Sequence, residues 1–151
     1  MLNRRPALTV LSVSPYEGDH QVLRSIVSRS NWALLCASDC HDAWRLVHSA
    51  PVSVVITERR FPDGFSWREL TEEMGNMQDA PAVIVAAPSD SESVWDQAIA
   101  AGAFDVLVKP FQPDDVRRAI SMAWQKSRDA RVLRSSIRLQ HRKPALGAAA
   151  I

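Results

Sequence analysis

The 151-residue sequence predicts an α/β protein built on a doubly wound parallel sheet of five strands. Five short runs rich in apolar and β-branched residues alternate with segments whose apolar residues recur at helical spacing. An interval of about 20–25 residues from strand to strand leaves room for one helix in each connection, as in parallel sheets with right-handed crossovers. Proline and glycine residues mark many of the changes from one kind of segment to the other.

The stretch 104–111 is the clearest of these units. Its apolar run ends at Lys109, and the following Pro110 restricts that lysine to extended conformations, so Lys109 closes a strand. Gly102 suits the left-handed residue after the preceding helix, and Pro113 suits the first position of the next helix. We therefore expect a cation at the carboxyl edge of the sheet, where open parallel sheets bind their ligands.

The other elements follow from the same patterns. The third apolar run is the most continuous of the first three, and a central position in the sheet is expected for it. Strands are expected at residues 7–13, 32–37, 52–57, 82–87 and 104–109.

The expected helices have recognisable ends. Asn31 suits a left-handed residue after the first helix, and residues 62–64 form a Pro-Asp-Gly turn signal. Helix starts are expected at Ser14 with Glu17, at Asp39, at Ser66 with Glu69, and at Ser89 to Glu92.

Length and composition fit a single domain with one core. No run of about 18 apolar residues is present, and the residues after Met1 lack the apolar region of a signal peptide. We therefore expect a cytoplasmic protein that does not span a membrane. Cys36 and Cys40 have no second pair and no suitably spaced histidine partners, which favours two free thiols over a disulfide or a zinc site.

Several motifs together resemble the receiver domain of bacterial two-component response regulators. They are Thr57-Glu58 followed by the Pro62-Asp63-Gly64 turn, Pro81 before the fourth strand, the Ala101-Gly102-Ala103 helix end, and Lys109-Pro110-Phe111. The resemblance covers about residues 7–125. It implies a flavodoxin-like (CheY-like) fold with strand order 2-1-3-4-5. Members of this family accept a phosphoryl group from a histidine kinase on one aspartate, with Mg²⁺, and then change the face formed by the fourth helix, fifth strand and fifth helix.

The resemblance also implies which positions would carry that chemistry, and most of them hold other residues here. The acceptor aspartate, four residues before the loop proline, falls on Glu58. The acidic pair for Mg²⁺ falls on Ser14 and Pro15, neither of which supplies a carboxylate, so Mg²⁺ binding and any other cofactor are not expected. The Thr or Ser that ends the fourth strand in this family, and whose hydroxyl follows a phosphoryl oxygen, falls on Ala86. The switch aromatic residue of the fifth strand falls on Val106. The family's lysine remains, as Lys109.

Two hypotheses for Glu58 stay open. A glutamate is one methylene longer than aspartate, so its carboxylate can reach toward Lys109 and imitate the phosphorylated state. Alternatively, Glu58 is a solvated relic and Lys109 bonds to backbone carbonyls. Glu17 and Asp19 could rescue a metal site from the following loop, although acids in loops are usually solvated.

Other residues carry weaker signals. The histidines at 20, 41, 48 and 141 have no nucleophile at a recognisable spacing, so packing or surface roles are expected for them. Trp95 and Trp124 belong to the fourth and fifth helices, where exposed aromatic side chains would suit a partner-binding face. Packing within the protein is the alternative for both.

Charge is divided unevenly along the chain. Residues 1–115 hold 9 Lys and Arg against 16 Asp and Glu, whereas residues 116–151 hold 9 against 1. We expect a receiver-like domain at 7–125 and a basic helical extension at 126–151 with a disordered end from Pro144. The extension could be solvated, pair with a second chain, or make nonspecific contact with nucleic acid or an acidic partner. Specific DNA binding is not expected, because about 25 residues cannot hold a winged-helix or helix-turn-helix module.

Three functions are compatible with these patterns. The first is a non-catalytic receiver that signals through contacts with a protein partner, such as a histidine kinase or a downstream signalling protein, without phosphorylation. The second is a working phosphoacceptor that takes a phosphoryl group from a histidine kinase. The third is a module that forms a homodimer through the fourth and fifth helices. The residues at Ser14 and Pro15 favour the first.

Overall fold

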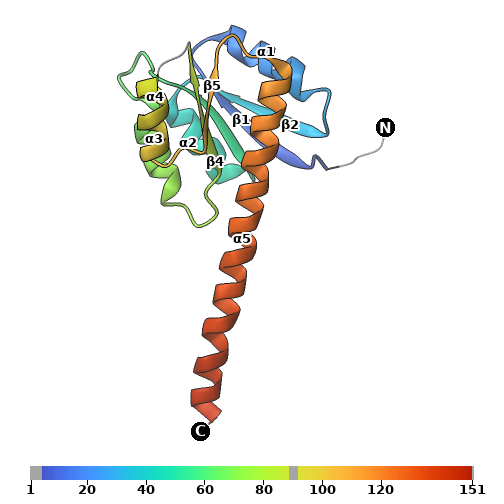
Figure 1. Ribbon diagram of the computed structural model, residues 1–151, viewed down its shortest axis with the longest axis vertical. Helices are drawn as coiled ribbons and strands as arrows, with labels where there is room; N and C mark the ends of the chain where they lie inside the picture. The colour runs from blue at the N-terminus through green and yellow to red at the C-terminus, as the bar shows by residue number, and fades with distance from the viewer. Residues whose placement is uncertain (1–4, 89–91, 151) are drawn as a thin grey trace.

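The computed structural model describes residues 5–88 and 92–150. Its five strands form one parallel sheet in the order β2-β1-β3-β4-β5, so the predicted fold and the central position of the third strand are confirmed. Figure 1 shows the helices on both sides of this sheet. The elements are β1 (Leu8–Val13), α1 (Glu17–Val27), β2 (Trp32–Ala37), α2 (Cys40–Ser49), β3 (Val54–Glu58), α3 (Trp67–Gly75), β4 (Ala82–Ala87), α4 (Glu92–Ala100), β5 (Asp105–Val108) and α5 (Pro113–Ala150).

Alternation along the strands divides the core between the two faces of the sheet. Val10 and Ile56 point to the face covered by α1 and α5, where they pack with Ile120. Their neighbours Leu11 and Val55 point to the opposite face and pack against α2 and α3. Because β1 and β3 are buried on both faces, most of their residues are apolar, with Thr9 and Ser12 as the polar residues of β1 and Thr57 and Glu58 at the end of β3.

Most predicted helix ends are confirmed. The Asp39 side chain accepts a hydrogen bond from the Asp42 N–H at 2.8 Å, and Ser66 with Glu69 forms a capping box. Gly102 has a φ of 101°, as its place after α4 requires, and α5 begins at Pro113. The proposed cap at residues 89–91 lies outside the described residues.

Two predictions about α1 are wrong. Ser14 does not cap it: the Ser14 hydroxyl accepts the Tyr16 N–H and donates to Asp19, and the helix begins at Glu17 without a side-chain cap. Among the described residues, only glycines have positive φ, so Asn31 is not left-handed. The helix instead ends in tight turns, in which the Arg29 and Ser30 N–H groups donate to carbonyls three residues earlier.

Helix α5 extends well beyond the body of the molecule (Figure 1). Its first turns pack on the sheet through Val116, Ile120 and Ala123, whereas Val132 and Leu133 are 65% and 61% exposed. The helix continues to Ala150, past Pro144, where the sequence predicts an irregular end. Proline removes one hydrogen bond from a helix but does not by itself stop the chain from remaining helical. The division of the chain at residues 125 and 126 stays a prediction.

None of the helices in the described ranges combines the length and the apolar character needed to cross a membrane.

Candidate functional site

Lys109 lies where the sequence analysis places it, directly after β5 at the carboxyl edge of the sheet. Its backbone N–H donates to the Ala87 carbonyl at 2.8 Å, which extends the pairing of β5 with β4 by one residue. The Lys109–Pro110 peptide bond is cis. Only about a fifth of the Lys109 side chain is exposed, so its ammonium group needs partners within the protein.

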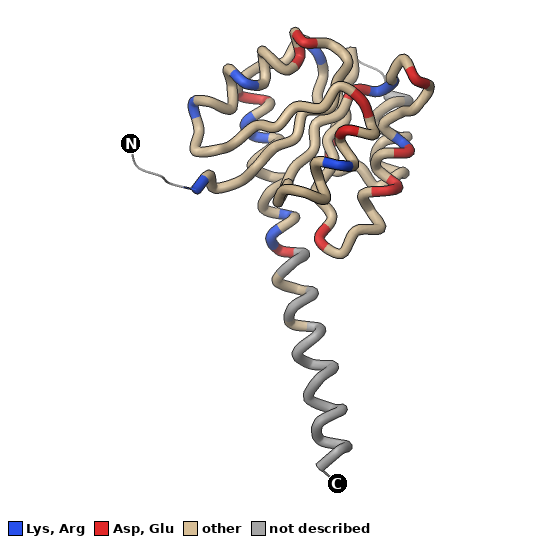
Figure 2. The backbone as a smooth tube through the Cα atoms, turned by 180° about the vertical axis from the view of Figure 1, so that it is seen from behind, with Lys and Arg blue, Asp and Glu red and all other residues tan. Residues whose placement is uncertain are grey.

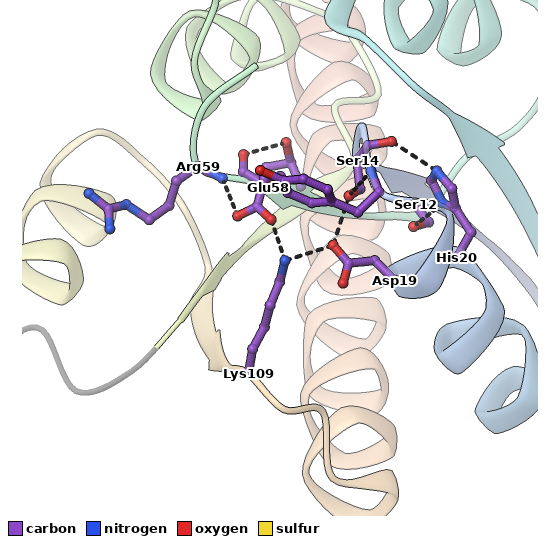
Figure 3. A network of polar contacts seen from close by, with 9 residues as sticks. Ser12, Ser14, Asp19, His20, Glu58, Arg59 and Lys109 are labelled. Carbon is purple, nitrogen blue, oxygen red and sulfur yellow. Dashed lines mark hydrogen bonds and ion pairs between the residues drawn. The ribbon is translucent and has the colours of Figure 1, made fainter. Parts of the chain in front are cut away.

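Glu58 is the last residue of β3 and is buried. One carboxylate oxygen, Oε1, accepts the Arg59 N–H at 3.0 Å, and the other, Oε2, accepts a hydrogen bond from Lys109 Nζ. Strand β4 lies between the two residues, with Ala86 opposite Glu58. The two long side chains thus bridge the end of β4, and the predicted approach of Glu58 to Lys109 is confirmed (Figure 3).

Asp19 is a second carboxylate on the same ammonium group. Lys109 Nζ donates to Asp19 Oδ2 at 2.6 Å, and the Ser14 hydroxyl donates to the same oxygen at 2.7 Å. The expectation that this acid is solvated is therefore wrong. Asp19 lies in the first turn of α1, and α1 is held so that this turn faces the end of β5. Glu17, also named for metal rescue, lies on the exposed start of α1.

A buried histidine connects this cluster to the core. His20 Nε2 donates to the Ser14 carbonyl at 2.9 Å, since a carbonyl oxygen can only accept, and Nδ1 is 2.8 Å from the Ser12 hydroxyl. In the neutral ring, Nδ1 accepts the Ser12 proton. His20 is only 4% exposed, which agrees with the packing role predicted for it. It fixes the turn between β1 and α1 and so the direction from which Asp19 approaches Lys109 (Figure 3).

The electrostatics of the cluster favour a charged lysine. Burial alone would lower the pKa of Lys109, but its hydrogen bonds to Asp19 and Glu58 and their negative charges outweigh burial and raise that pKa above 10.5. The Tyr16 and Phe111 rings lie 5.3 and 6.0 Å from Nζ and add cation–π contacts. One cation thus lies between two carboxylates at the sheet edge.

The residues present do not fit Mg²⁺. Mg²⁺ requires near-octahedral oxygen ligands at short distances. Ser14 is buried at the end of β1 and its hydroxyl is used by Asp19 and Tyr16, and Pro15 has no side-chain oxygen. The lysine ammonium lies against both Asp19 and Glu58, where a cation would otherwise bind. Among the described residues, no group of three or more His, Cys, Asp or Glu side chains is arranged to hold a metal ion.

The two switch-equivalent positions are apolar packing positions. Ala86 is buried in β4 between Glu58 and Leu107 and has no hydroxyl to offer a phosphoryl oxygen. Val106 is half-buried beside the cluster of Trp67, Val85, Ala98 and Ala103, which joins α3, β4 and α4. A hollow of about 310 Å³ beside these strand ends is lined by Tyr16, Glu58, Arg59, Arg60, Pro88 and Lys109.

The two tryptophans named for a partner face have different surroundings. Trp95 on α4 is 47% exposed, and it belongs to the same helix as the exposed Ile99. Trp124 on α5 is half-buried against the core, and the Arg128 guanidinium lies 5.0 Å from its ring. Exposed apolar side chains continue on β5 and α5 as Val108 and Met122. The face formed by α4, β5 and α5 therefore presents apolar surface.

A five-stranded parallel sheet in this order is the flavodoxin-like fold, which receiver domains share with other α/β proteins. The chain belongs to the response regulator receiver domain family, whose model matches residues 17–121. The matched span starts after Ser14 and Pro15. The protein is therefore a receiver domain of two-component signalling, and receivers interact with histidine kinases and phosphotransfer proteins.

Individual relatives agree with this assignment. The chain is 29% identical over 123 residues to the two-component response regulator ORR5 of Oryza sativa, covering 80% of this chain and 91% of the relative. It is 26% identical over 119 residues to the hydrogenase transcriptional regulatory protein HoxA of Bradyrhizobium diazoefficiens, covering 78% of this chain but 24% of that protein.

Solved structures of receivers show the same fold. The signal receiver domain of an HD domain-containing protein from Pseudomonas fluorescens Pf-5 superposes with a TM-score of 0.75 at 23% identity, over 87% of this chain and 95% of that one. The receiver domain of the Saccharomyces cerevisiae response regulator Ssk1, crystallised with the histidine phosphotransfer protein Ypd1, has a TM-score of 0.71 at 15% identity. That match covers 80% of this chain and 91% of the other.

Proposed function

We propose that this receiver signals through protein contacts without accepting a phosphoryl group, without a metal cofactor and without catalytic activity of its own. The observation that supports this most is the double ion pair of Lys109 with Glu58 and Asp19, at an edge where Ser14 and Pro15 stand in place of an acidic pair.

The chemistry of phosphoryl transfer explains why this arrangement disfavours an acceptor role. The transferred group carries charge on its oxygens, and catalysis depends on positioning and on neutralising that charge with metal ions and cations. Here the positions of the metal-binding acidic pair hold Ser14 and Pro15, and the carboxylates of Asp19 and Glu58 are already paired with Lys109. Both oxygens of Glu58 are also engaged, one by the Arg59 N–H and one by Lys109.

The same contacts suit a built-in imitation of the phosphorylated state. By the resemblance, Glu58 occupies the position of the aspartate that accepts the phosphoryl group, and Lys109 is the lysine of the family. In this chain the longer Glu58 side chain brings negative charge to Lys109 directly, and Asp19 adds a second carboxylate. The end of β5 is thereby tied to β3 and α1 without any modification.

The face formed by α4, β5 and α5 is the surface we propose for the partner. Its exposed Trp95, Ile99, Val108 and Met122 offer apolar contact area close to the strand that Lys109 ends. The partner we propose is a histidine kinase or a downstream signalling protein. The basic part of the chain supplies charge without a DNA-reading module, which supports at most weak nonspecific contact with nucleic acid.

The test is incubation of the full chain with Mg²⁺ and a small phosphodonor, followed by intact-mass measurement. We expect the mass to remain that of the unmodified protein, and we expect the same for Glu58→Asp, because the metal carboxylates are still missing. The triple variant Ser14→Asp, Pro15→Asp, Glu58→Asp adds the two missing carboxylates and replaces the glutamate by aspartate, and it serves as the comparison. A stoichiometric phosphoryl adduct on the unaltered chain would overturn the proposal.

A further inference from the structure

A groove between α2 and α3 has a volume of about 540 Å³ and is separate from the Lys109 edge. Trp44, Phe65 and Leu70 supply its apolar lining. Phe65 is 49% exposed and adds to the apolar surface that the groove presents. Glu69 and Glu73, four residues apart on α3, line the same groove.

The groove lies in a negative electrostatic environment. Burial raises the pKa of Cys40, which lines the groove, to about 12, and the negative charges of Asp63, Glu69, Asp39 and Glu73 add to that shift. The nearest cation on α3, Arg68, is directed to Gln97 of α4 at 3.1 Å and lies over the Trp67 ring. On α2, Arg45 is paired with Asp42 at 3.1 Å. A ligand of this groove would therefore carry positive charge beside an apolar part.

The chain itself contains a segment with that chemistry. Residues 116–151 hold 9 Lys and Arg and one acidic residue. In the sequence, Arg131, Arg134, Arg138 and Arg142 recur at intervals of three and four residues, and Leu133 and Ile137 are four apart. In a helix, residues at this spacing lie on one face, with about 5–6 Å between Cβ atoms of successive members. The spacing of Glu69 and Glu73 on α3 is the same.

The tail of one molecule leads away from its own groove. Helix α5 is continuous from Pro113 and leaves the body as a single rod (Figure 1), and Figure 2 shows the acidic and basic positions of that body from behind. From residue 127 to 150 a helix spans about 35 Å. A second molecule can therefore supply this segment, whereas the same molecule would have to break its helix to do so.

We infer that the groove between α2 and α3 binds the basic C-terminal half of α5 from a second copy of this chain. The arginine charges of that segment complement the charges of Glu69 and Glu73, and its apolar residues complement Trp44 and Phe65. Reciprocal exchange of the two tails forms a twofold dimer, in which each molecule gives one helix and receives one. This association is independent of the partner face on α4, β5 and α5.

The experiment is light scattering of the full-length chain at low and at high salt. We expect a dimer at low salt that dissociates as salt screens the charges. Glu73→Arg reverses one charge in the groove and should weaken association about tenfold or more. The matched control is Glu72→Arg, a reversal of the neighbouring exposed residue on the same helix, which does not line the groove and should leave the dimer intact.

Exchanging the charges of Glu73 and Arg138 tests whether the basic half of α5 is the segment bound in the groove. Arg138→Glu should weaken the dimer as Glu73→Arg does, and the double variant Glu73→Arg, Arg138→Glu should recover it. Arg138→Glu also keeps the test valid if Glu73→Arg fails to fold, because residue 138 lies beyond the turns of α5 that pack on the sheet. A monomeric wild type at every salt concentration, equal effects of Glu72→Arg and Glu73→Arg, or no recovery in the double variant would each overturn the inference.

Discussion

The interior of the sheet and its carboxyl edge are formed by the same strands, but different forces hold them. In β1 and β3 the side chains before the strand ends, such as Leu11 and Val55, are fully buried among apolar neighbours. At the ends of those strands, Ser14 and Glu58 belong to a polar cluster that also includes Asp19, His20 and Lys109. Hydrophobic burial determines the interior, and a few directional hydrogen bonds determine the edge.

Because different forces hold the two regions, the fold of a receiver does not depend on the residues that carry the chemistry at its edge. The interior needs only apolar side chains of suitable size at alternating positions, and it has them. The edge can exchange an acidic pair for serine and proline without loss of the sheet, provided that every buried polar group finds a partner. The described edge residues meet that condition by pairing with one another.

The largest effect of a substitution on the free energy of unfolding is expected in the interior of the sheet. Ile56→Ala removes a fully buried side chain from the cluster between the sheet and helices α1 and α5. We expect a loss of about 2–5 kcal/mol in the free energy of unfolding, from lost burial and the cavity left behind. Urea denaturation measures it, with Val132→Ala, at an exposed position, as the control that should change little. Similar midpoints for the two variants would contradict the assignment of Ile56 to the core.

A smaller loss in the free energy of unfolding is expected for a substitution at the carboxyl edge. Lys109→Met keeps an unbranched side chain that is one atom shorter, and it leaves the carboxylates of Asp19 and Glu58 without their cation. We expect a loss of about 1–2 kcal/mol, less than for a fully buried pair because Lys109 and Asp19 are each 19% exposed. The same urea measurement applies. A Lys109→Met protein that is more stable than the wild type would mean that the desolvation of these charges outweighs their favourable contacts.

Alkaline pH should remove the contribution of Lys109 to the stability of the edge. The folded-state pKa of Lys109 is raised above 10.5, so its contribution to stability is complete below pH 10.5 and is lost as pH rises through the folded value. The pKa of Cys40 is raised from 9.0 to about 12, so the wild type and Lys109→Met both lose stability between those values as the unfolded thiol ionises. The difference between the two proteins, measured by urea denaturation at a series of pH values, should therefore shrink only above pH 10.5. A difference that already disappears at pH 9 would contradict the ion pairs.

The smallest effect on stability is expected for Glu58→Gln. The amide has one acceptor oxygen, so it keeps the hydrogen bond from Lys109 or the one from the Arg59 N–H but not both, and it loses the charge; we expect about 1 kcal/mol of destabilisation and an intact fold. Under the proposed function it should nevertheless weaken binding to the protein partner, because the end of β5 is less firmly held. Circular dichroism and partner affinity, compared with the wild type, measure the two parts. Unchanged affinity would leave Glu58 as a structural residue only.

Local patterns were sufficient to predict the interior, and the edge required tertiary contacts that no local pattern contains. Strand β4 is found at the predicted residues because a strand buried on both faces is a continuous apolar run. The approach of Glu58 to Lys109 followed from strand order, since only β4 separates them. The pairing of Asp19 with Lys109 joins residues 90 positions apart and depends on the direction of α1.

The role of Ser14 shows the same limit. Its spacing to Glu17 is that of a capping box, but the nearby Tyr16 N–H and Asp19 carboxylate use its hydroxyl instead. A pattern of four residues cannot say which of two nearby donors and acceptors a side chain will choose. The helix cap at Ser66, where no charged network competes, was predicted correctly.

The central claim is that the ion pairs of Lys109 take the place of the metal and the phosphoryl group. An NMR titration of the nitrogen-15-labelled full-length protein tests this claim. Mg²⁺ is added first, and Mg²⁺ with beryllium fluoride, an analogue of the phosphoryl group, is added second. We expect no saturable shifts of the amide signals of Arg59, Ala87 and Lys109 in either titration. Saturable shifts at these three residues would show that the edge binds the metal and the analogue, and would contradict the account.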